Sequence, residues 1–327
     1  MKKHPLKISE SEVIRYPKKE IDLSIFESFY KECGEYPGVK KMNSEISSLW
    51  SQIFDEFDIN IFQVLQNKDL NKLKELYEDY YINGISHGAS SGKVKTLENE
   101  KKLIKKSHRN INRVEFLGNH FGYGESEPNK VYELLYKKYK IPDAINDGQT
   151  WGWQYGDNFV HFEIADYIYF LDILIKILDE YGLDKTMFVG EGSGLLSSLL
   201  YNNYDIKESH QIDFGHFLLK QYLTNYDSGV NVKYHYAENF QTDFKHNSQI
   251  LINQDSFPEM TIESMEKYIE NAKLNNVNLI LSYNTAAIRP DGRHINFYKV
   301  LKASGYQNIW EIESTIRPQY FIELFQL

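Results

Sequence analysis

The sequence is short of the features that mark secreted and membrane proteins. Among its 327 residues there is one cysteine, Cys33, so no internal disulfide can form, as expected of a protein from a reducing cytoplasm. The apolar run at 168–178 is interrupted by Asp172 and Lys176, and is too short and too charged to span a bilayer. The lysines near the N-terminus precede no apolar stretch, so we expect no signal peptide. These absences predict a cytoplasmic protein without a membrane span.

Positive charge is also scarce, because 37 Lys and Arg face 46 Asp and Glu for a net charge of −9. A nucleic-acid backbone would be repelled overall, which argues against a nucleic-acid partner and leaves a small molecule or a glycan. Hydrophobic residues make up 42% and aromatic residues 15%, enough for a sizeable core and for stacking surfaces. Nothing in the sequence defines an oligomeric state, and a homo-oligomer stays open.

Residues 1–150 are predicted to form a mainly helical substrate or lid region. Apolar residues recur at helical spacing over 44–57, and Asp69 is a candidate N-cap for a helix over 69–82. A further helix is expected at 130–139. Glycine-rich segments at 83–93 and 118–129 predict loops. A third irregular stretch is expected at 146–159.

Residues 151–327 change pattern. An amphipathic helix is predicted at 161–183, closed by Gly182. Short apolar runs then alternate with helical stretches, which predicts an α/β domain with a mostly parallel sheet. The runs are at 186–190, 210–213, 230–236, 249–253, 278–284, 308–314 and 319–327; the helical stretches are at 195–203, 215–224, 260–274 and 293–303.

The last two apolar runs are separated only by 315–318, a link too short for a parallel crossover. The final pair must therefore be antiparallel. Seven strands ending in an antiparallel hairpin predict a Rossmann-like class I methyltransferase sheet rather than a dehydrogenase sheet.

A glycine-rich turn follows the first predicted strand. Gly190, Gly192 and Gly194 permit a tight turn, and the free amides of the next helix favour a carboxylate or a phosphate. In a methyltransferase this group is the carboxylate of the methionine moiety. Counted from Gly192, the third glycine of a dinucleotide fingerprint is replaced by Ser197. A plain tight turn in another α/β domain is the alternative.

Polar residues end the second and third strands. Asp213 lies 21 residues after Gly192, close to the spacing of an acidic residue that binds ribose hydroxyls, and its carboxylate can accept two hydrogen bonds from a vicinal diol. Capping of the next helix is the alternative. Asn239 is a candidate for binding adenine or a surface turn residue.

The fourth strand ends at Asn253, Gln254 and Asp255, at the carboxyl edge where open α/β sheets bind ligands. Pro258 is predicted to begin the next helix, with Glu259 in its first turn. Either Asp255 or Ser256 can cap that helix, and capping and catalysis can coexist here.

Residues 250–272 and 210–223, with the Trp-Gly segment at 151–159, resemble bacterial sugar O-methyltransferases encoded near surface-polysaccharide genes. The resemblance covers about 150–327. It implies S-adenosylmethionine as cofactor and a sugar hydroxyl as acceptor in polysaccharide biosynthesis. That family has an acidic residue where the glycine turn begins, whereas this chain has Gly190 with Glu191 beside it. Candidate cofactor contacts are Gly190, Glu191, Gly192, Ser193, Gly194, Asp213, Phe214, Asn239 and Asn253.

Methyl transfer needs the acceptor oxygen aligned about 3–3.5 Å from the methyl group, and a general base helps a weakly nucleophilic hydroxyl. The candidate bases are Asp255, Glu259 and His294, with His120 and His87 in glycine-rich loops as weaker alternatives. A divalent metal held by Asp255 and Glu259 stays open, although no dense ligand cluster supports it.

Substrate contacts are expected from aromatic and basic side chains. Trp151, Trp153 and Tyr155 can stack on a sugar ring or a nucleobase, with core packing as the alternative. Arg289 and Arg293 can hold a phosphate or carboxylate, or lie on the surface. Two other functions remain in view: a nicotinamide-dependent nucleotide-sugar enzyme, and a methyltransferase-like scaffold without catalysis in glycan assembly.

Overall fold

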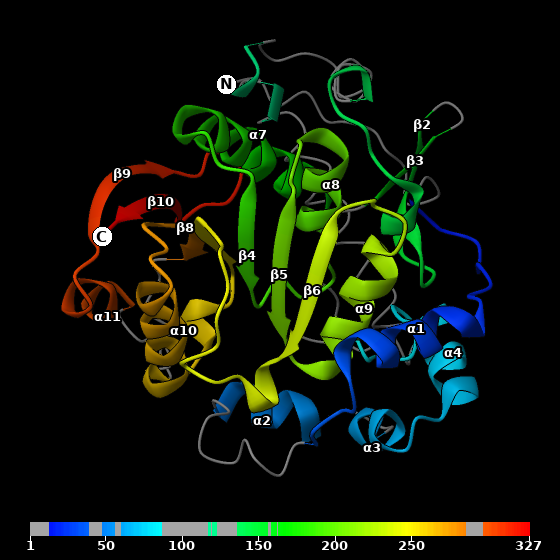
Figure 1. Cartoon of the computed structure of the whole chain (residues 1–327). Coiled ribbons are helices and arrows are strands. Elements are labelled where there is room, and N and C mark those ends of the chain that lie inside the picture. The colour runs from blue at the N-terminus through cyan, green and yellow to red at the C-terminus, as the bar shows by residue number, and fades with distance from the viewer. Residues whose placement is uncertain are drawn as a thin grey trace.

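A large central sheet with helices on both sides dominates the computed structural model, and a smaller sheet lies beside it (Figure 1). The structure describes residues 13–38, 48–55, 60–86, 117–118, 120–122, 136–155, 158–161, 163–285 and 297–327. No helix in these ranges has both the length and the apolar character needed to cross a bilayer.

The large sheet has seven strands in the order β6-β5-β4-β7-β8-β10-β9. Strands β4 to β8 are parallel, and β10 lies between β8 and β9 and is antiparallel to both. The strands are β4 (Lys185–Val189), β5 (Glu208–Asp213), β6 (Asn231–Tyr236), β7 (Ile250–Gln254), β8 (Leu279–Thr285), β9 (Gln307–Glu313) and β10 (Tyr320–Gln326). This strand order, with its antiparallel final hairpin, is the class I methyltransferase sheet, as the apolar runs predicted.

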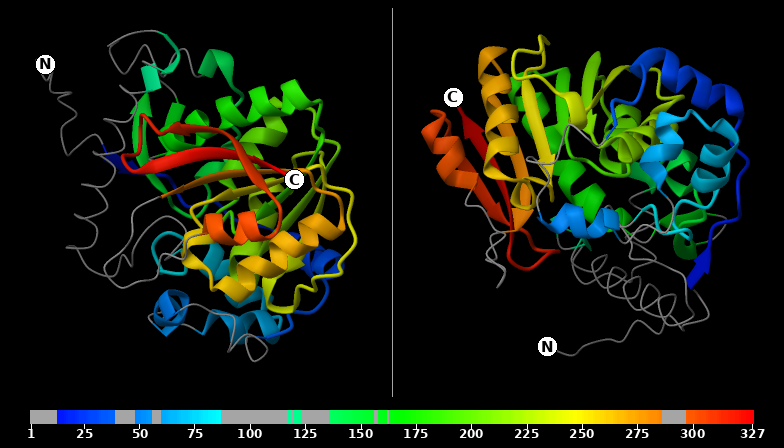
Figure 2. Two further views of the ribbon diagram at one scale, coloured as in Figure 1. Left: turned by 90° about the vertical axis from the view of Figure 1, so that its left-hand side faces the viewer. Right: turned by 90° about the horizontal axis from the view of Figure 1, so that it is seen from below.

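The helices cover both faces of this sheet, as Figure 2 shows from two further directions. Alternate residues of a strand point to opposite faces, so the neighbours Met187 and Phe188 of β4 belong to separate apolar clusters. The Phe188 cluster includes α7 and α8, and the Met187 cluster includes α10 and α11. The helices are α7 (Ile164–Tyr181), α8 (Leu195–Asn203), α9 (Gly215–Asn225), α10 (Ile262–Leu274) and α11 (Phe297–Ala303).

Helix ends follow local chemistry. Gly182 ends α7 in the left-handed conformation (φ 64°), as predicted. Pro258 lies in the first turn of a helix together with Glu259, as predicted, but this is the short 3-10 helix η5 (Phe257–Glu259). The longer helix α10 begins separately after Thr261, whose hydroxyl accepts from the Ser264 amide. Ser256 is the N-cap residue of η5 but makes no capping hydrogen bond with its side chain, and neither Asp255 nor Ser256 caps α10.

The N-terminal part is helical but also contains strands. Its elements are β1 (Val13–Arg15), α1 (Leu23–Cys33), α2 (Ser48–Asp55), α3 (Ile61–Gln66), α4 (Leu70–Glu78), η3 (Asp143–Asn146), β2 (Trp151–Tyr155) and β3 (Asn158–His161). The irregular stretch expected at 146–159 is wrong, because β2 pairs with β1 and β3 in a three-stranded antiparallel sheet. A side chain at Gly152 would overlap the backbone of Val160, so only glycine fits there.

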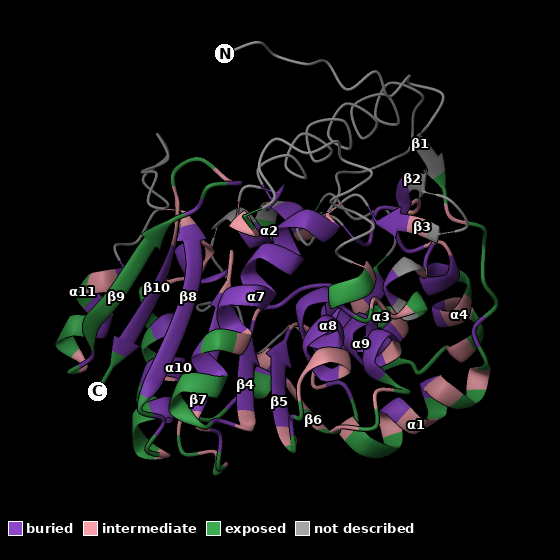
Figure 3. Cartoon of the chain, turned by 90° about the horizontal axis from the view of Figure 1, so that it is seen from above, coloured by how far each residue is buried: buried purple, intermediate pink, exposed green. Residues whose placement is uncertain are grey.

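The N-terminal helices share a core with the main domain. One apolar cluster joins side chains of α1, α3 and α4 to Leu218, Leu219 and Tyr222 of α9 and to Tyr236 of β6. Figure 3 shows how β4, β5 and β8 are buried while the edge strand β9 is exposed.

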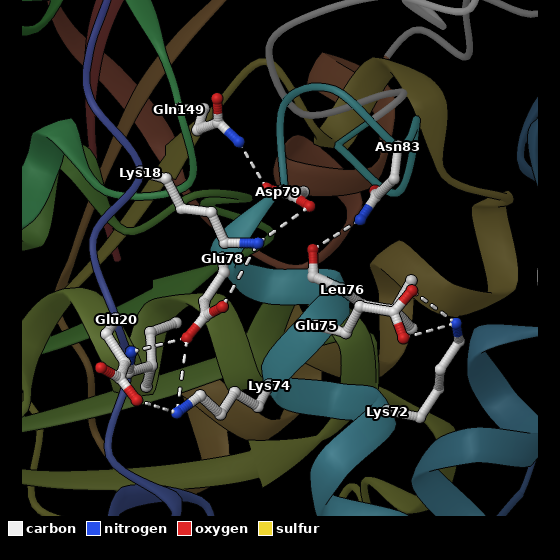
Figure 4. Close-up of polar contacts among 11 residues, drawn as sticks. Lys18, Glu20, Lys72, Lys74, Glu75, Leu76, Glu78, Asp79, Asn83 and Gln149 are labelled. Atoms are coloured by element: carbon white, nitrogen blue, oxygen red, sulfur yellow. Dashed lines mark hydrogen bonds and ion pairs between the residues drawn. The ribbon is translucent and has the colours of Figure 1, made fainter.

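Polar contacts around α4 fasten the preceding chain to this helix (Figure 4). The Glu78 carboxylate accepts from the Ile21 amide at 3.0 Å and pairs with Lys18 at 3.4 Å. Asp69 caps α4 as predicted, accepting from the Lys72 amide at 3.0 Å. The N-terminal region is therefore packed on α9, next to the carboxyl end of β5.

Candidate active site

An open pocket lies at the carboxyl ends of β4, β5 and β7, where the predicted site was placed. Its volume is about 890 Å³, including the solvent space at its mouth. The residues that line it come from the strand ends, the segments that follow them and four α-helices. They are Trp50, Tyr167, Val189, Gly190, Glu191, Gly192, Ile212, Asp213, Phe214, Phe217, Ala237, Gln254, Asp255, Ser256, Glu259, Met260, Ser264 and Tyr268.

The glycine turn forms the floor of this pocket. Gly190, Gly192 and Gly194 all have positive φ, at 68°, 75° and 77°. An added Cβ would lie 2.5 Å from Cβ of Ser256 at Gly190, and 2.9 Å from Cα of Gln221 at Gly194. Glycine is therefore needed at these two positions for close packing inside the protein, in addition to the backbone conformation.

The Asp213 carboxylate faces both the pocket and its own backbone. It accepts from the amides of Gly192 at 2.8 Å and Phe214 at 2.8 Å, and from Nε2 of Gln221 at 2.7 Å. A carboxylate has about four acceptor positions, so about one remains for a ligand. We expected Asp213 to accept hydrogen bonds from two ribose hydroxyls, but this arrangement leaves an acceptor position for about one. Burial raises the pKa of Asp213 to about 7, against the lowering effect of these hydrogen bonds.

Glu191 supplies a second buried carboxylate. Its Oε1 accepts from the Ser197 amide at 2.6 Å in the first turn of α8, whereas Oε2 has no hydrogen-bond partner among the described residues. Burial raises the pKa of Glu191 to about 7. This oxygen is shielded from solvent as well as unpaired, which favours the protonated form of the carboxyl group.

Four of the predicted cofactor contacts lie outside the pocket lining: Ser193, Gly194, Asn239 and Asn253. Asn239 is exposed. The Asn253 amide instead holds the strand ends together. It donates to the Val189 carbonyl at 2.9 Å and accepts from the Phe257 amide at 3.1 Å. Ala237 takes the place at the end of β6 that was expected of Asn239.

The candidate bases Asp255 and Glu259 both line the pocket. Asp255 has a left-handed backbone (φ 61°), and its amide donates to the Tyr283 carbonyl at 3.1 Å. Its carboxylate forms an ion pair with Arg317, whose guanidinium lies 3.6 Å from the centre of the Tyr320 ring. Arg317 belongs to the 315–318 link and was not predicted, because only the folded hairpin brings it to Asp255.

Several aromatic lining residues were also missed. Tyr167 comes from α7, Phe217 from α9, Tyr268 from α10 and Trp50 from α2. Figure 1 shows α2 below the carboxyl ends of the parallel strands, remote from them in sequence. Helical spacing identified the segment around Trp50, but not which face would meet the sheet.

The remaining candidates are placed apart or lie outside the described residues. Trp151 is 4% exposed and packs in the main core under Arg15, outside the pocket lining. His120 contacts Asp172 at 3.0 Å. His87, Arg289, Arg293 and His294, and the side chains of Trp153 and Tyr155, lie outside the described part of the chain.

The pocket is electrostatically one-sided. Its described lining holds the carboxyl groups of Glu191, Asp213, Asp255 and Glu259 and no lysine, arginine or histidine, and one of the four, Asp255, is paired with Arg317 outside the lining. The described residues contain no group of three or more potential metal ligands. Such a wall, interleaved with aromatic rings, attracts a cation and disfavours a pyrophosphate.

No family model matches the chain, and no curated protein does. Solved structures similar to it include the methyltransferase domain of a bacterial CtHen1 (10% identity, 48% of this chain and 97% of that one, TM-score 0.38). Magnesium protoporphyrin IX methyltransferase from Synechocystis PCC 6803 with bound SAM is another (14% identity, 53% and 88%, TM-score 0.38). An S-adenosylmethionine-dependent methyltransferase from Clostridium acetobutylicum ATCC 824 is a third (12% identity, 50% and 92%, TM-score 0.38). With TM-scores of 0.38, these likenesses carry no argument here, and the fold is assigned from the strand order of the chain.

Proposed function

We propose that this protein is an S-adenosylmethionine-dependent O-methyltransferase that acts on a sugar hydroxyl. The observation that carries the proposal is the pocket itself. It joins a glycine turn, a strand-end aspartate and a wall of carboxyl groups without a described basic residue, at the ligand-binding edge of a class I methyltransferase sheet.

The described side chains suit the parts of this cofactor. Asp213 retains about one acceptor position for a ribose hydroxyl. The Glu191 carboxyl group, which lines the pocket beside the glycine turn, is the candidate partner of the ammonium group of the methionine moiety. The carboxyl groups and the rings of Tyr167 and Phe214 suit a sulfonium cation. When bound here, the cofactor supplies an electrophilic methyl group.

The acceptor side of the pocket is assigned to Asp255 and Glu259. Asp255 is held by Arg317 and by its own backbone bond to Tyr283, so its carboxylate has a fixed place from which to accept a hydrogen bond from an acceptor hydroxyl. Glu259, half-buried four residues later, is the candidate general base. A neutral, hydroxyl-rich acceptor suits these carboxyl groups better than an anionic one, and the resemblance at 250–272 supports a sugar.

Isothermal titration calorimetry with S-adenosylmethionine tests the cofactor. We expect saturable binding to the full chain and at least tenfold weaker binding to Asp213→Ala, because the ribose loses its hydrogen-bond acceptor. Glu313→Gln, which removes an exposed charge on the remote strand β9, is the control and should bind as the wild type does. Absence of binding to the wild type would refute the proposal.

The acceptor is tested by mass spectrometry of surface glycans from cells with and without the gene. A mass difference of one methyl group on a hexose or deoxyhexose is the expected result. Complementation with Glu259→Gln should fail to restore that group although the variant still binds S-adenosylmethionine. Glycans that are identical in both strains would remove sugar methylation from the proposal and leave the cofactor assignment standing.

A further inference from the structure

Trp50 reaches the pocket from outside the main domain. It lies in α2, is 8% exposed and lines the pocket. Its ring makes edge contacts with Phe214 (centroids 5.4 Å apart) and Phe217 (5.6 Å). These rings, with Ile53 and Phe54, form a small apolar cluster of their own, separate from the main cores.

The neighbours of Trp50 define which end of the pocket it covers. Moving across the sheet from β4 to β5 to β6, the pocket wall passes from Gly190 to Asp213 and then to Ala237. Phe214 directly follows Asp213, the residue assigned to the ribose. A ring in contact with Phe214 is therefore at the nucleoside end, and Glu191 lies on the β4 side.

The chain that precedes α2 is anchored to the same rim. Tyr36, which precedes α2, donates from its hydroxyl to Oε1 of Glu238 at 2.8 Å. The Gly215 amide donates to the same oxygen at 2.9 Å. Glu238 adjoins the lining residue Ala237. The N-terminal segment is thus tied, through Tyr36, to the end of the pocket assigned to the nucleoside.

We propose that Trp50 is a cofactor-binding residue whose indole packs against the adenosine moiety. The inference rests on the proposed function and extends it, because the binding site is then incomplete without the N-terminal region. An indole packed on a purine is worth about tenfold or more in affinity, by analogy with base stacking on aromatic side chains. Displacement of α2 would expose the nucleoside to water.

Calorimetry on full-length variants tests this assignment with S-adenosylhomocysteine and with 5′-methylthioadenosine, which lacks the amino-acid group. Trp50→Ala should weaken both ligands by about tenfold. Trp50→Phe, which keeps an aromatic ring, should lose much less. The matched control is Trp310→Ala, on the exposed face of β9, which should bind both ligands as the wild type does. Thermal unfolding with and without ligand confirms that each variant is folded.

The outcomes are distinct. Wild-type affinity of Trp50→Ala for both ligands overturns the role of Trp50 while the proposed function stands. A loss confined to S-adenosylhomocysteine overturns the placement at the nucleoside and moves Trp50 to the amino-acid end. No binding of either ligand to the wild type overturns the proposed function, and this inference with it. A parallel tenfold loss for both ligands, partly rescued by phenylalanine, supports the assignment.

Discussion

The affinity for an adenosyl ligand should fall as the pH falls below 7, and Asp213 should cause most of the effect. Burial raises the pKa of this carboxyl to about 7, although three hydrogen bonds oppose the shift. Protonation places a hydrogen on an oxygen that otherwise accepts from the ribose. A ligand that needs the ionised form therefore binds more weakly once the carboxyl is protonated.

The expected magnitude follows from the ionised fraction. With a pKa of about 7, that fraction is about 0.76 at pH 7.5 and about 0.09 at pH 6.0, so the dissociation constant should rise roughly eightfold. The stability of the ligand-free protein should depend on pH in the opposite direction. Because the pKa of Asp213 is raised in the folded state, this residue favours folding at low pH, and its contribution to stability is lost as the pH rises through 7.

Calorimetry with S-adenosylhomocysteine between pH 6.0 and 7.5 measures the effect. Asp213→Asn cannot ionise, so it should bind weakly at every pH and show a flatter profile. Glu191→Gln separates the second carboxyl, whose pKa is also raised to about 7 by burial. If Asp213→Asn retains the pH slope of the wild type, or if wild-type affinity rises toward pH 6, the reasoning is refuted.

Three further predictions concern stability and are measured by urea denaturation. A side chain in the left-handed conformation costs about 1–2 kcal/mol of the free energy of unfolding, and Gly182→Ala should lose only this amount because the space around Gly182 is open. Gly190→Ala should lose more, because its Cβ would also collide with buried atoms of Ser256. Equal losses for the two variants would contradict this prediction. Arg317→Met should lower the free energy of unfolding by at most about 1–3 kcal/mol, because it leaves the carboxylate of Asp255 without its ion-pair partner and that carboxylate is partly exposed. The double variant with Asp255→Asn should lose less than the sum of the two single changes. Burial lowers the pKa of His216 to about 3, so the unfolded chain takes up its proton first and the stability contribution is lost as the pH falls below 6.5. Between pH 8 and pH 5 this loss is about 2 kcal/mol, and His216→Leu should be less sensitive to acid by that amount.

The main sheet could be predicted because its signals are local. The strands β4, β7, β8 and β10 are apolar runs, and the 315–318 link is too short for anything except a hairpin. The strands β2 and β3 were missed because the glycines of this segment suggested a loop, although Trp151, Trp153 and Tyr155 stand at every second position, as in a strand. Gly152 reads as a turn residue, yet it is there because the backbone of Val160 lies too close for any side chain.

The site was predictable only where it lies on the strands that were predicted. Gly190, Asp213 and Asp255 were found because strand ends of a parallel sheet meet at one edge. Asn253 lies at the same edge but points its amide into the protein, a difference of side-chain direction that spacing does not encode. Trp50 and Arg317 contact residues of the site that are distant from them in the sequence, and a local sequence pattern does not predict such contacts.

The place of β10 between β8 and β9 has a consequence for synthesis on the ribosome. Residues 320–326 are the last strand of the sheet to be made, and two earlier strands depend on them for pairing. Until these residues leave the exit tunnel, β8 has one open edge and β9 has no partner in the sheet. The nascent chain therefore carries unpaired strand edges until β10 has left the ribosome, and such edges are exposed to aggregation in the meantime.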